Sequence, residues 1–191
     1  MLKSSSKQVM DLVRILRLAK EGVDYDYSSL QIDLPQEVSS RIIQWGKAHI
    51  PEENLYDTEE KKFGRENDIH VTLLYGIIDK KPKRVQELLS EVAPFEVRLG
   101  LVSFFKDHKD RDVVKIDVES SDLLKLHYDI RKGIDNKNDY PTYNPHVTVA
   151  YVKKRSCDDL IGDDFMLNKK FTVNTVVFSS SEGTKVDVQL K

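Results

Sequence analysis

Apolar and polar residues either alternate or recur at helical spacing along most of the chain, and this pattern predicts its secondary structure. Residues 27–34, YSSLQIDL, place Leu30, Ile32 and Leu34 on one face of a strand that Pro35 ends. Helices are predicted at 5–20, 38–46, 82–92 and 123–134, with a short one at 156–162. Further strands are predicted at 69–77, 95–105, 112–118, 146–152, 171–181 and 184–190.

These elements follow one another in a repeated order. After the strand at 27–34, a unit of helix, strand, helix and two strands occurs twice. Two similar lobes would account for this order, and the fold class is therefore predicted as α+β, with two pseudo-symmetric α/β lobes whose antiparallel sheets flank a central cleft. Residues 1–26 precede the repeat and are predicted to form a helical extension, whereas residues 27–191 form a single bilobed domain. The charged segment 51–68 is predicted to be a long loop of the kind that forms lids or stays disordered.

The repeat includes a motif that could carry chemistry. DIHVTLLYGI and YNPHVTVAYV both contain His-Val-Thr followed three residues later by tyrosine, at His70, Thr72 and Tyr75 and again at His146, Thr148 and Tyr151. A chain with 5 histidines and 8 tyrosines in 191 residues would rarely carry this pattern twice by chance. Alternation puts each histidine on the same face as its threonine, and we expect both faces to point into the shared cleft.

Two imidazoles and two hydroxyls in one cleft suit the cleavage of a phosphodiester. A neutral histidine can take a proton from the attacking oxygen, and a protonated one can give a proton to the leaving oxygen. The hydroxyls of Thr72 and Thr148 can stabilise charge on the phosphate oxygens. The pattern does not say which histidine is the acid and which is the base. No carboxylate or cysteine repeats beside the histidines at a ligand spacing, so neither a metal nor another cofactor is predicted.

Composition narrows the class of partner. The net charge of −2, with 32% charged residues of both signs, argues against binding of long duplex DNA. The single cysteine, Cys157, excludes an intramolecular disulfide and fits a reducing cytoplasm. No apolar run approaches the ~20 residues of a membrane helix, and Arg14 and Arg17 interrupt the apolar part of the N-terminus, which makes it a poor secretory signal. We therefore expect a cytoplasmic monomer that does not associate with membranes.

IHVTLLYG and PHVTVAYV resemble the paired His-x-Thr motifs of the 2H phosphoesterase superfamily. This superfamily includes RNA 2′,3′-cyclic phosphodiesterases, 2′–5′ oligoadenylate phosphodiesterases and phage anti-CBASS enzymes that degrade cyclic-oligonucleotide signals. The resemblance covers residues 27–190 and implies a bilobed fold, with His70, Thr72, His146 and Thr148 as catalytic residues. Ile69 stands where a proline is common before the first histidine. The charged segment LYDTEEKKFGREND resembles that of phage-associated members, which implies a host-cytoplasmic enzyme acting on a defence signal.

The remaining candidates would bind substrate. Tyr25 and Tyr27 could stack on a base, while the resemblance implies base contacts at Phe104, Phe178 and Glu182. Alternation places Tyr75 and Tyr151 with the core, although both follow the motif closely enough to be binding candidates. Cationic side chains that could attract phosphates are Arg65, Lys80, Lys81 and Lys83.

The sequence therefore predicts a metal-independent phosphodiesterase. Its substrate would be a cyclic nucleotide, a cyclic oligonucleotide or a short RNA end. The alternative is a catalytically weak module that binds and sequesters such a nucleotide.

Overall fold

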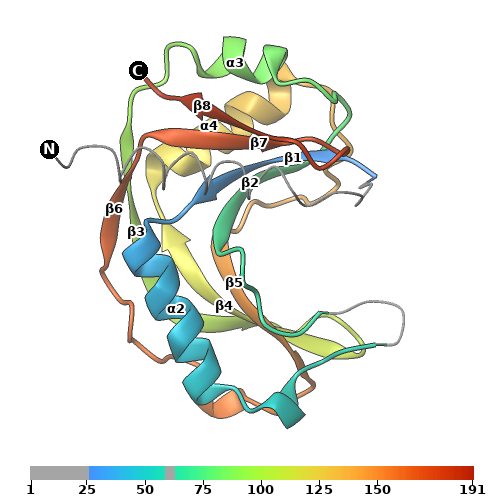
Figure 1. Cartoon of the computed structure of the whole chain (residues 1–191), viewed down its shortest axis with the longest axis vertical. Helices are drawn as coiled ribbons and strands as arrows, with labels where there is room; N and C mark the ends of the chain where they lie inside the picture. The colour runs from blue at the N-terminus through green and yellow to red at the C-terminus, as the bar shows by residue number, and fades with distance from the viewer. Residues whose placement is uncertain (1–25, 59–62) are drawn as a thin grey trace, which may run out of the picture.

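The computed structural model describes residues 26–58 and 63–191, so the helix predicted at 5–20 lies outside the described residues. The described chain forms one curled sheet with three α-helices and two short 3₁₀ helices (Figure 1). The strands are β1 (Ser28–Asp33), β2 (His70–Ile77), β3 (Phe95–Phe105), β4 (Arg111–Glu119), β5 (His146–Lys153), β6 (Lys170–Val173), β7 (Thr175–Ser179) and β8 (Lys185–Gln189). The helices are α2 (Gln36–His49), α3 (Lys83–Leu89), α4 (Ser121–Gly133), η1 (Glu52–Asn54) and η2 (Asp158–Leu160).

The sheet has eight antiparallel strands in the order β6-β3-β4-β5-β2-β1-β7-β8. The two histidine strands, β2 and β5, are therefore its central pair, and each is followed outward by three strands of its own half. They share a single paired position, Val71 with Val147, beyond which the two halves separate. Each half of the sheet thus holds one histidine strand, as predicted for the two lobes, but the halves do not follow the repeated units: β3 and β4 of the first unit lie beside β5, and β7 and β8 of the second unit lie in the half of β2. The sheet curls into an arc that is open on one side (Figure 1).

One predicted strand proves to be two. Residues 171–181 divide at Asn174 into β6, which pairs with β3 at one end of the sheet, and β7, which pairs with β1 in the other half. The sequence has no Gly or Pro at this break, and its one sign there is that the buried Val173 and Val176 are three residues apart, which interrupts the alternation of a single strand. The predicted hairpin over 171–190 is therefore correct only for β7 and β8.

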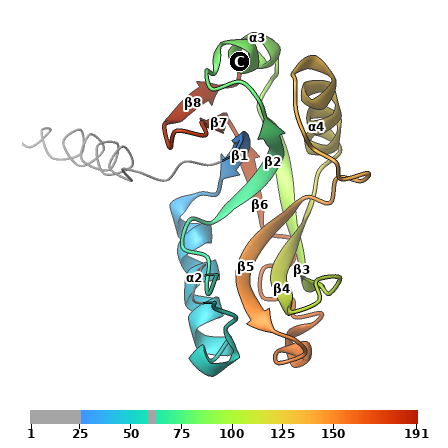
Figure 2. The ribbon, with the colours of Figure 1, turned by 90° about the vertical axis from the view of Figure 1, so that its right-hand side faces the viewer.

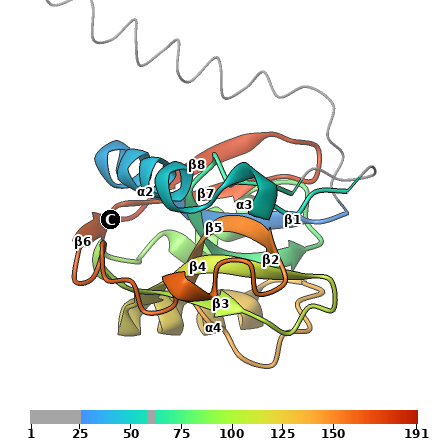
Figure 3. The ribbon, with the colours of Figure 1, turned by 90° about the horizontal axis from the view of Figure 1, so that it is seen from below.

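Helices cover the sheet from two sides. Figures 2 and 3 show α2 and α4 on opposite sides of the sheet. Helix α3 contacts α4 at one end of the molecule (Figure 2). Helix α2 buries Val38, Ile42 and Trp45, and its Gly46 lies so close to β5 that an added Cβ would meet Val149 at 3.1 Å. Helix α4 begins at the N-cap Ser120, whose hydroxyl accepts a hydrogen bond from the backbone N–H of Leu123. It packs against β2 and β3.

The segments that lead into the two histidine strands cross over to the opposite half. The first lead-in, residues 54–58 and 63–66, pairs with the free edge of β5 through bridges at Leu55–Val152 and Arg65–Ala150. The second lead-in, residues 134–144, runs along the free edge of β2, where the N–H of Lys137 donates to the carbonyl of Gly76 at 2.8 Å. The described part of the predicted 51–68 loop is therefore ordered as an addition to the sheet, because the edge of β5 offers it hydrogen-bond partners.

Candidate active site

Two histidines and two threonines converge where β2 and β5 meet. The antiparallel register at Val71–Val147 sets His70 opposite Thr148 and Thr72 opposite His146. All four side chains line one cavity of about 580 Å³ between the separating halves of the sheet. The structure thus brings the four predicted catalytic residues together in the predicted cleft.

Both imidazoles are anchored in the same way. Nδ1 of His70 lies 2.5 Å from the carbonyl oxygen of Asp68, and Nδ1 of His146 lies 2.7 Å from that of Asn144. A carbonyl oxygen can only accept, so each Nδ1 carries a hydrogen and donates it. This fixes the tautomer and leaves Nε2 of each ring as the nitrogen that a ligand could meet.

The environment of His146 favours its neutral form. Burial lowers the pKa of His146 and is the largest influence, the hydrogen bond to Asn144 opposes it, and the nearby ammonium of Lys115 lowers the pKa further. The carboxylate of Asp117 raises the pKa and the imidazole of His70 lowers it. The edge of the Phe105 ring packs against His146 with ring centroids 4.7 Å apart, which adds to the exclusion of water.

A bulge follows each threonine and redirects the tyrosine beyond it. On β1, Leu30 pairs with Leu74 and the next residue, Gln31, pairs with Thr72, so β2 has one extra residue between the two pairs. The same irregularity occurs on β5, where Ala150 and Thr148 pair with successive residues of β4. Since one extra residue reverses the alternation, Tyr75 and Tyr151 turn into the cleft and line it, with Tyr75 44% exposed. The expectation that both rings belong to the core is therefore wrong.

Beyond Val71, the edge of β2 that faces the cleft is not paired with β5, and two side chains donate hydrogen bonds to its backbone carbonyls instead. The hydroxyl of Tyr143 donates to the carbonyl of Thr72 at 2.9 Å, and Nδ1 of His127 donates to that of Leu73 at 2.7 Å. The two rings stack with their centroids 3.9 Å apart. His127 lies on the helix predicted at 123–134, is only 2% exposed and lines the cleft.

We expect Tyr143→Phe to destabilise the fold by ~1–3 kcal/mol, because the buried carbonyl of Thr72 would lose its donor. The measurement is urea denaturation monitored by circular dichroism. Tyr128→Phe is the matched control, since Tyr128 is an exposed residue of the same helix as His127, and it should leave the midpoint unchanged. An unchanged midpoint for Tyr143→Phe would show that water replaces the hydroxyl without cost.

A cluster of a cation and aromatic rings lines another part of the cleft. The guanidinium of Arg111 lies over the ring of Phe63 at 4.6 Å, and Phe63 contacts Tyr151 with centroids 5.1 Å apart. Arg111 also pairs with Asp110 at 3.0 Å. Apart from the histidines, Arg111 is the sole basic side chain among the described residues that line this cavity, so it is a candidate phosphate contact that the sequence did not single out.

The other predicted binding residues lie elsewhere. Tyr25 is outside the described residues. Tyr27 packs its ring against Tyr75 but does not line the cavity, and Phe178 is a fully buried core residue. Phe104 packs against the core, because alternation along β3 gives the cleft to its neighbour Phe105. Glu182 is exposed and does not line the cavity.

The predicted phosphate-attracting cations are also away from the cleft. Lys80 pairs with Glu182 at 3.0 Å. Arg65 donates to the carbonyl of Gly46 at 3.3 Å and pairs with Glu52, which ties the first lead-in to α2. Lys81 and Lys83 are exposed and do not line the cavity.

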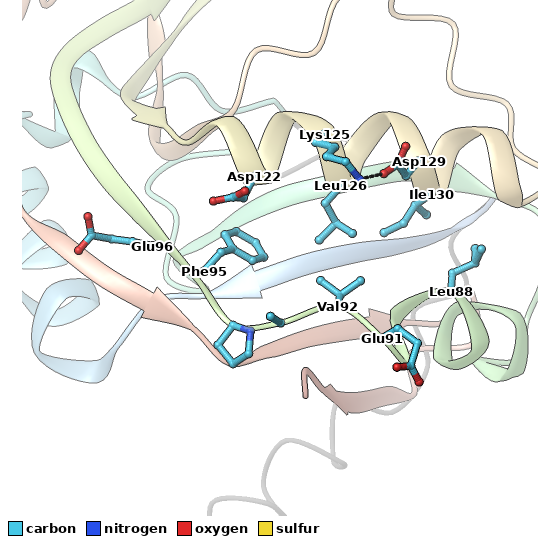
Figure 4. A pocket seen from close by; sticks show the side chains of 12 residues that line it. Leu88, Glu91, Val92, Phe95, Glu96, Asp122, Lys125, Leu126, Asp129 and Ile130 are labelled. Carbon is cyan, nitrogen blue, oxygen red and sulfur yellow. Dashed lines mark hydrogen bonds and ion pairs between the residues drawn. The ribbon is translucent and has the colours of Figure 1, made fainter.

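A second cavity shares no lining residue with the cleft. It has a volume of about 630 Å³ and lies between α4, the end of α3 and the start of β3 (Figure 4). Its floor is apolar and includes Val92, Phe95 and Leu126, and its rim carries Asp122 and the ion pair Lys125–Asp129. It therefore lacks the imidazoles and hydroxyls that make the cleft chemically competent.

Residues 26–58 and 63–191 hold neither a membrane-spanning helix nor a ready metal cluster. None of the helices there is long and apolar enough to cross a bilayer. No three histidine, cysteine, aspartate or glutamate side chains of those residues gather closely enough to hold a metal ion.

Known proteins share this architecture. The structure of TT0787 from Thermus thermophilus superposes with a TM-score of 0.62 at 15% identity, over 86% of this chain and 99% of that one. The structure of E. coli LigT complexed with phosphate gives a TM-score of 0.57 at 20% identity, over 86% and 94%. No curated protein matches by sequence. The sequence model of the 2′-5′ RNA ligase superfamily matches residues 47–185, which include both His-x-Thr motifs. The chain therefore belongs to the 2′-5′ RNA ligase superfamily of 2H phosphoesterases.

Proposed function

We propose that this phosphoesterase is a metal-independent phosphodiesterase of cyclic nucleotides or oligonucleotides, with His70 and His146 as its acid–base pair. The observation that carries the proposal is the equivalence of the two histidines. Each is anchored through Nδ1 to the carbonyl two residues before it, and each lies opposite the threonine of the other strand. Such a pair can move one proton in and one proton out across a single phosphate.

The proposed reaction on a ribose 3′–5′ linkage balances with these groups alone. One Nε2 takes the proton of the 2′-hydroxyl as its oxygen bonds to phosphorus, and the other Nε2–H protonates the 5′-oxygen as the P–O5′ bond breaks. The products are a 2′,3′-cyclic phosphate and a free 5′-hydroxyl. Thr72 and Thr148 would donate hydrogen bonds to the non-bridging oxygens, where negative charge increases.

Two kinds of substrate fit the same chemistry. A cyclic di- or trinucleotide signal, as degraded by phage anti-CBASS enzymes, presents 3′–5′ linkages with a neighbouring 2′-hydroxyl. An RNA end presents a 2′,3′-cyclic phosphate that water must open. E. coli LigT has been crystallised with 3′-AMP, with ATP and with NADP⁺, which supports a nucleotide as the ligand here. The cyclic signal is our preferred substrate because the sequence LYDTEEKKFGREND resembles the corresponding segment of phage-associated members.

The direct test is incubation of the protein with a panel of nucleotides, followed by mass spectrometry. The panel contains 2′,3′-cyclic mononucleotides, linear 2′–5′ and 3′–5′ dinucleotides, and cyclic di- and trinucleotides. Cleavage of any member supports the phosphodiesterase. Recovery of every member intact, with one of them bound to the protein, would support the sequestering module instead.

Removal of divalent metal is expected to leave the rate unchanged. The proposed charge stabilisers are threonine hydroxyls and an imidazolium, and neither needs an ion. The measurement compares kcat in excess EDTA with kcat in added Mg²⁺ or Mn²⁺. Loss of activity in EDTA that one of these ions restores would contradict the metal-independent mechanism.

A further inference from the structure

A second internal repeat lies beside the first. Strand β1 carries Gln31-Ile32-Asp33 and β4 carries Lys115-Ile116-Asp117. The registers align them with the two motifs in the same way. Gln31 pairs with Thr72 and Asp33 with His70, while Lys115 pairs with Thr148 and Asp117 with His146. Since paired residues of neighbouring strands project from the same face, each His-x-Thr is flanked by an equivalent pair of side chains.

The two flanks differ by one positive charge. On β1 the neutral amide of Gln31 donates to the carboxylate of Asp33 at 2.7 Å. On β4 the ammonium of Lys115 contacts the carboxylate of Asp117 and lies 2.5 Å from the hydroxyl of Ser103. Ser103 is the partner of Lys115 on β3. The corresponding partner of Gln31, on β7, is Val177. The hydroxyl that holds the lysine in the second half therefore has an apolar counterpart in the first.

Lys115 is held close to His146. It is 7% exposed, and its ammonium lies 4.7 Å from the centroid of the Phe105 ring. The same ring packs edge-on against His146. A buried lysine is costly unless it is paired, and Asp117 supplies the pairing. The side chain projects from the same face as Thr148 but does not line the cleft, so it can act on substrate only through its neighbours.

We propose that Lys115 is a positioning residue that makes the two histidines unequal, so that His146 serves as the base and His70 as the acid. This inference rests on the proposed function and goes beyond it by assigning the two roles. The charged or titratable groups facing His146 are Lys115 and Asp117 from β4 and His70 from β2. Those facing His70 are Asp33 from β1, His146 from β5, and Asp68 of its own lead-in, which pairs with Lys185 of β8 at 2.6 Å.

The consequence is a directed proton transfer. The lysine offsets Asp117, so His146 lies in a buried site without net negative charge, and its Nε2 lone pair is free to take the proton of the attacking hydroxyl. On the His70 side the residue equivalent to Lys115 is the neutral Gln31, so no ammonium stands at that position beside the first histidine. The Nε2–H of His70 then protonates the leaving oxygen.

The roles are tested with a leaving group that needs no acid. A ribonucleoside 3′-(4-nitrophenyl phosphate) has the same 2′-hydroxyl nucleophile as a dinucleotide but expels 4-nitrophenolate. His70→Ala should stay within about tenfold of wild type on this ester and lose ~10²–10⁴-fold on the dinucleotide. His146→Ala should lose ~10²–10⁴-fold on both. The reverse pattern would make His70 the base and overturn the assignment. If the wild-type protein cleaves neither the ester nor the dinucleotide, the proposed phosphodiesterase function itself is wrong, and so is the assignment that rests on it.

The contribution of Lys115 is tested by pH profiles of kcat/KM. Removing the ammonium leaves Asp117 facing His146, so Lys115→Gln should move the acidic limb up by about one pH unit and lower the rate about tenfold on that limb. The rate on the plateau should stay within a fewfold.

A paired variant controls for folding. Lys115→Gln combined with Asp117→Asn removes both charges and leaves no carboxylate without its ammonium partner, so it should fold and return the acidic limb to within about half a pH unit of wild type. A uniform loss at all pH values in both variants, without displacement of either limb, would mean that Lys115 is only structural.

Discussion

Replacement of either cleft histidine by alanine is expected to lower kcat by ~10²–10⁴ while the protein stays folded and binds ligand. Neither His70 nor His146 is a fully buried core residue, so the loss of the ring should not unfold the sheet. The measurement is turnover of the best member of the nucleotide panel under saturating conditions. Thermal unfolding and ligand binding of each variant are followed in parallel.

The matched control is His49→Ala. His49 is an exposed residue near the end of α2, and its Nδ1 also lies 2.9 Å from a backbone carbonyl, that of Trp45. His49 therefore makes the same kind of hydrogen bond as the cleft histidines but does not line the cleft. Its replacement by alanine should leave kcat unchanged. If His70→Ala or His146→Ala keeps more than about a third of wild-type turnover, that histidine does not belong to the acid–base pair.

Removal of the ribose 2′-hydroxyls is expected to abolish cleavage of a 3′,3′-cyclic dinucleotide. In the ribose form the attacking oxygen is already held near phosphorus, and such intramolecular attack can reach an effective concentration of ~10⁵ M or more. The deoxy form must use water, so its rate should fall by ~10³-fold or more. The two compounds are compared by mass spectrometry at equal concentration.

The outcomes separate the two kinds of substrate. Equal rates for the ribose and deoxy forms would show that water is the nucleophile. If neither form is cleaved while a linear RNA end with a 2′,3′-cyclic phosphate is opened, the cyclic signal is not the substrate and the RNA end replaces it. Binding of both cyclic forms without cleavage of any linkage would favour the sequestering module.

Local pattern was sufficient for most elements of the fold. Alternation in YSSLQIDL predicted β1, whose Leu30 and Ile32 are buried, and helical spacing predicted the buried Leu123, Leu126 and Ile130 of α4. The superfamily and the general fold class are confirmed. What local pattern could not give is which strands become neighbours, because the pairing of β6 with β3 and of β7 with β1 depends on contacts distant in sequence.

The rest of the cleft could not be predicted, for identifiable reasons. Alternation assumes an uninterrupted strand, and the extra residue after each threonine reversed it at Tyr75 and Tyr151. Phe104 and Phe105 are adjacent, so composition alone could not tell which one faces the cleft. His127 and Tyr143 enter only because β2 and β5 separate and leave carbonyls to be satisfied. One signal was present in the sequence, namely the match between QID and KID in the strands that flank the two histidine strands.

The crossing of the two lead-ins has a consequence for how the molecule is made. Each half of the sheet takes an edge from chain that belongs to the other half, and β1 finds its outer neighbour only when Ser29 meets Ser179. Neither half is complete while the ribosome still holds the last strands, so the nascent chain should fold late and slowly, as expected for a topology dominated by distant pairings. Chains released before β7 would carry both histidine motifs but leave the outer edge of β1 unpaired. A protease that removes the last strands would therefore expose the edge of a strand that pairs with β2, without touching a residue of the site.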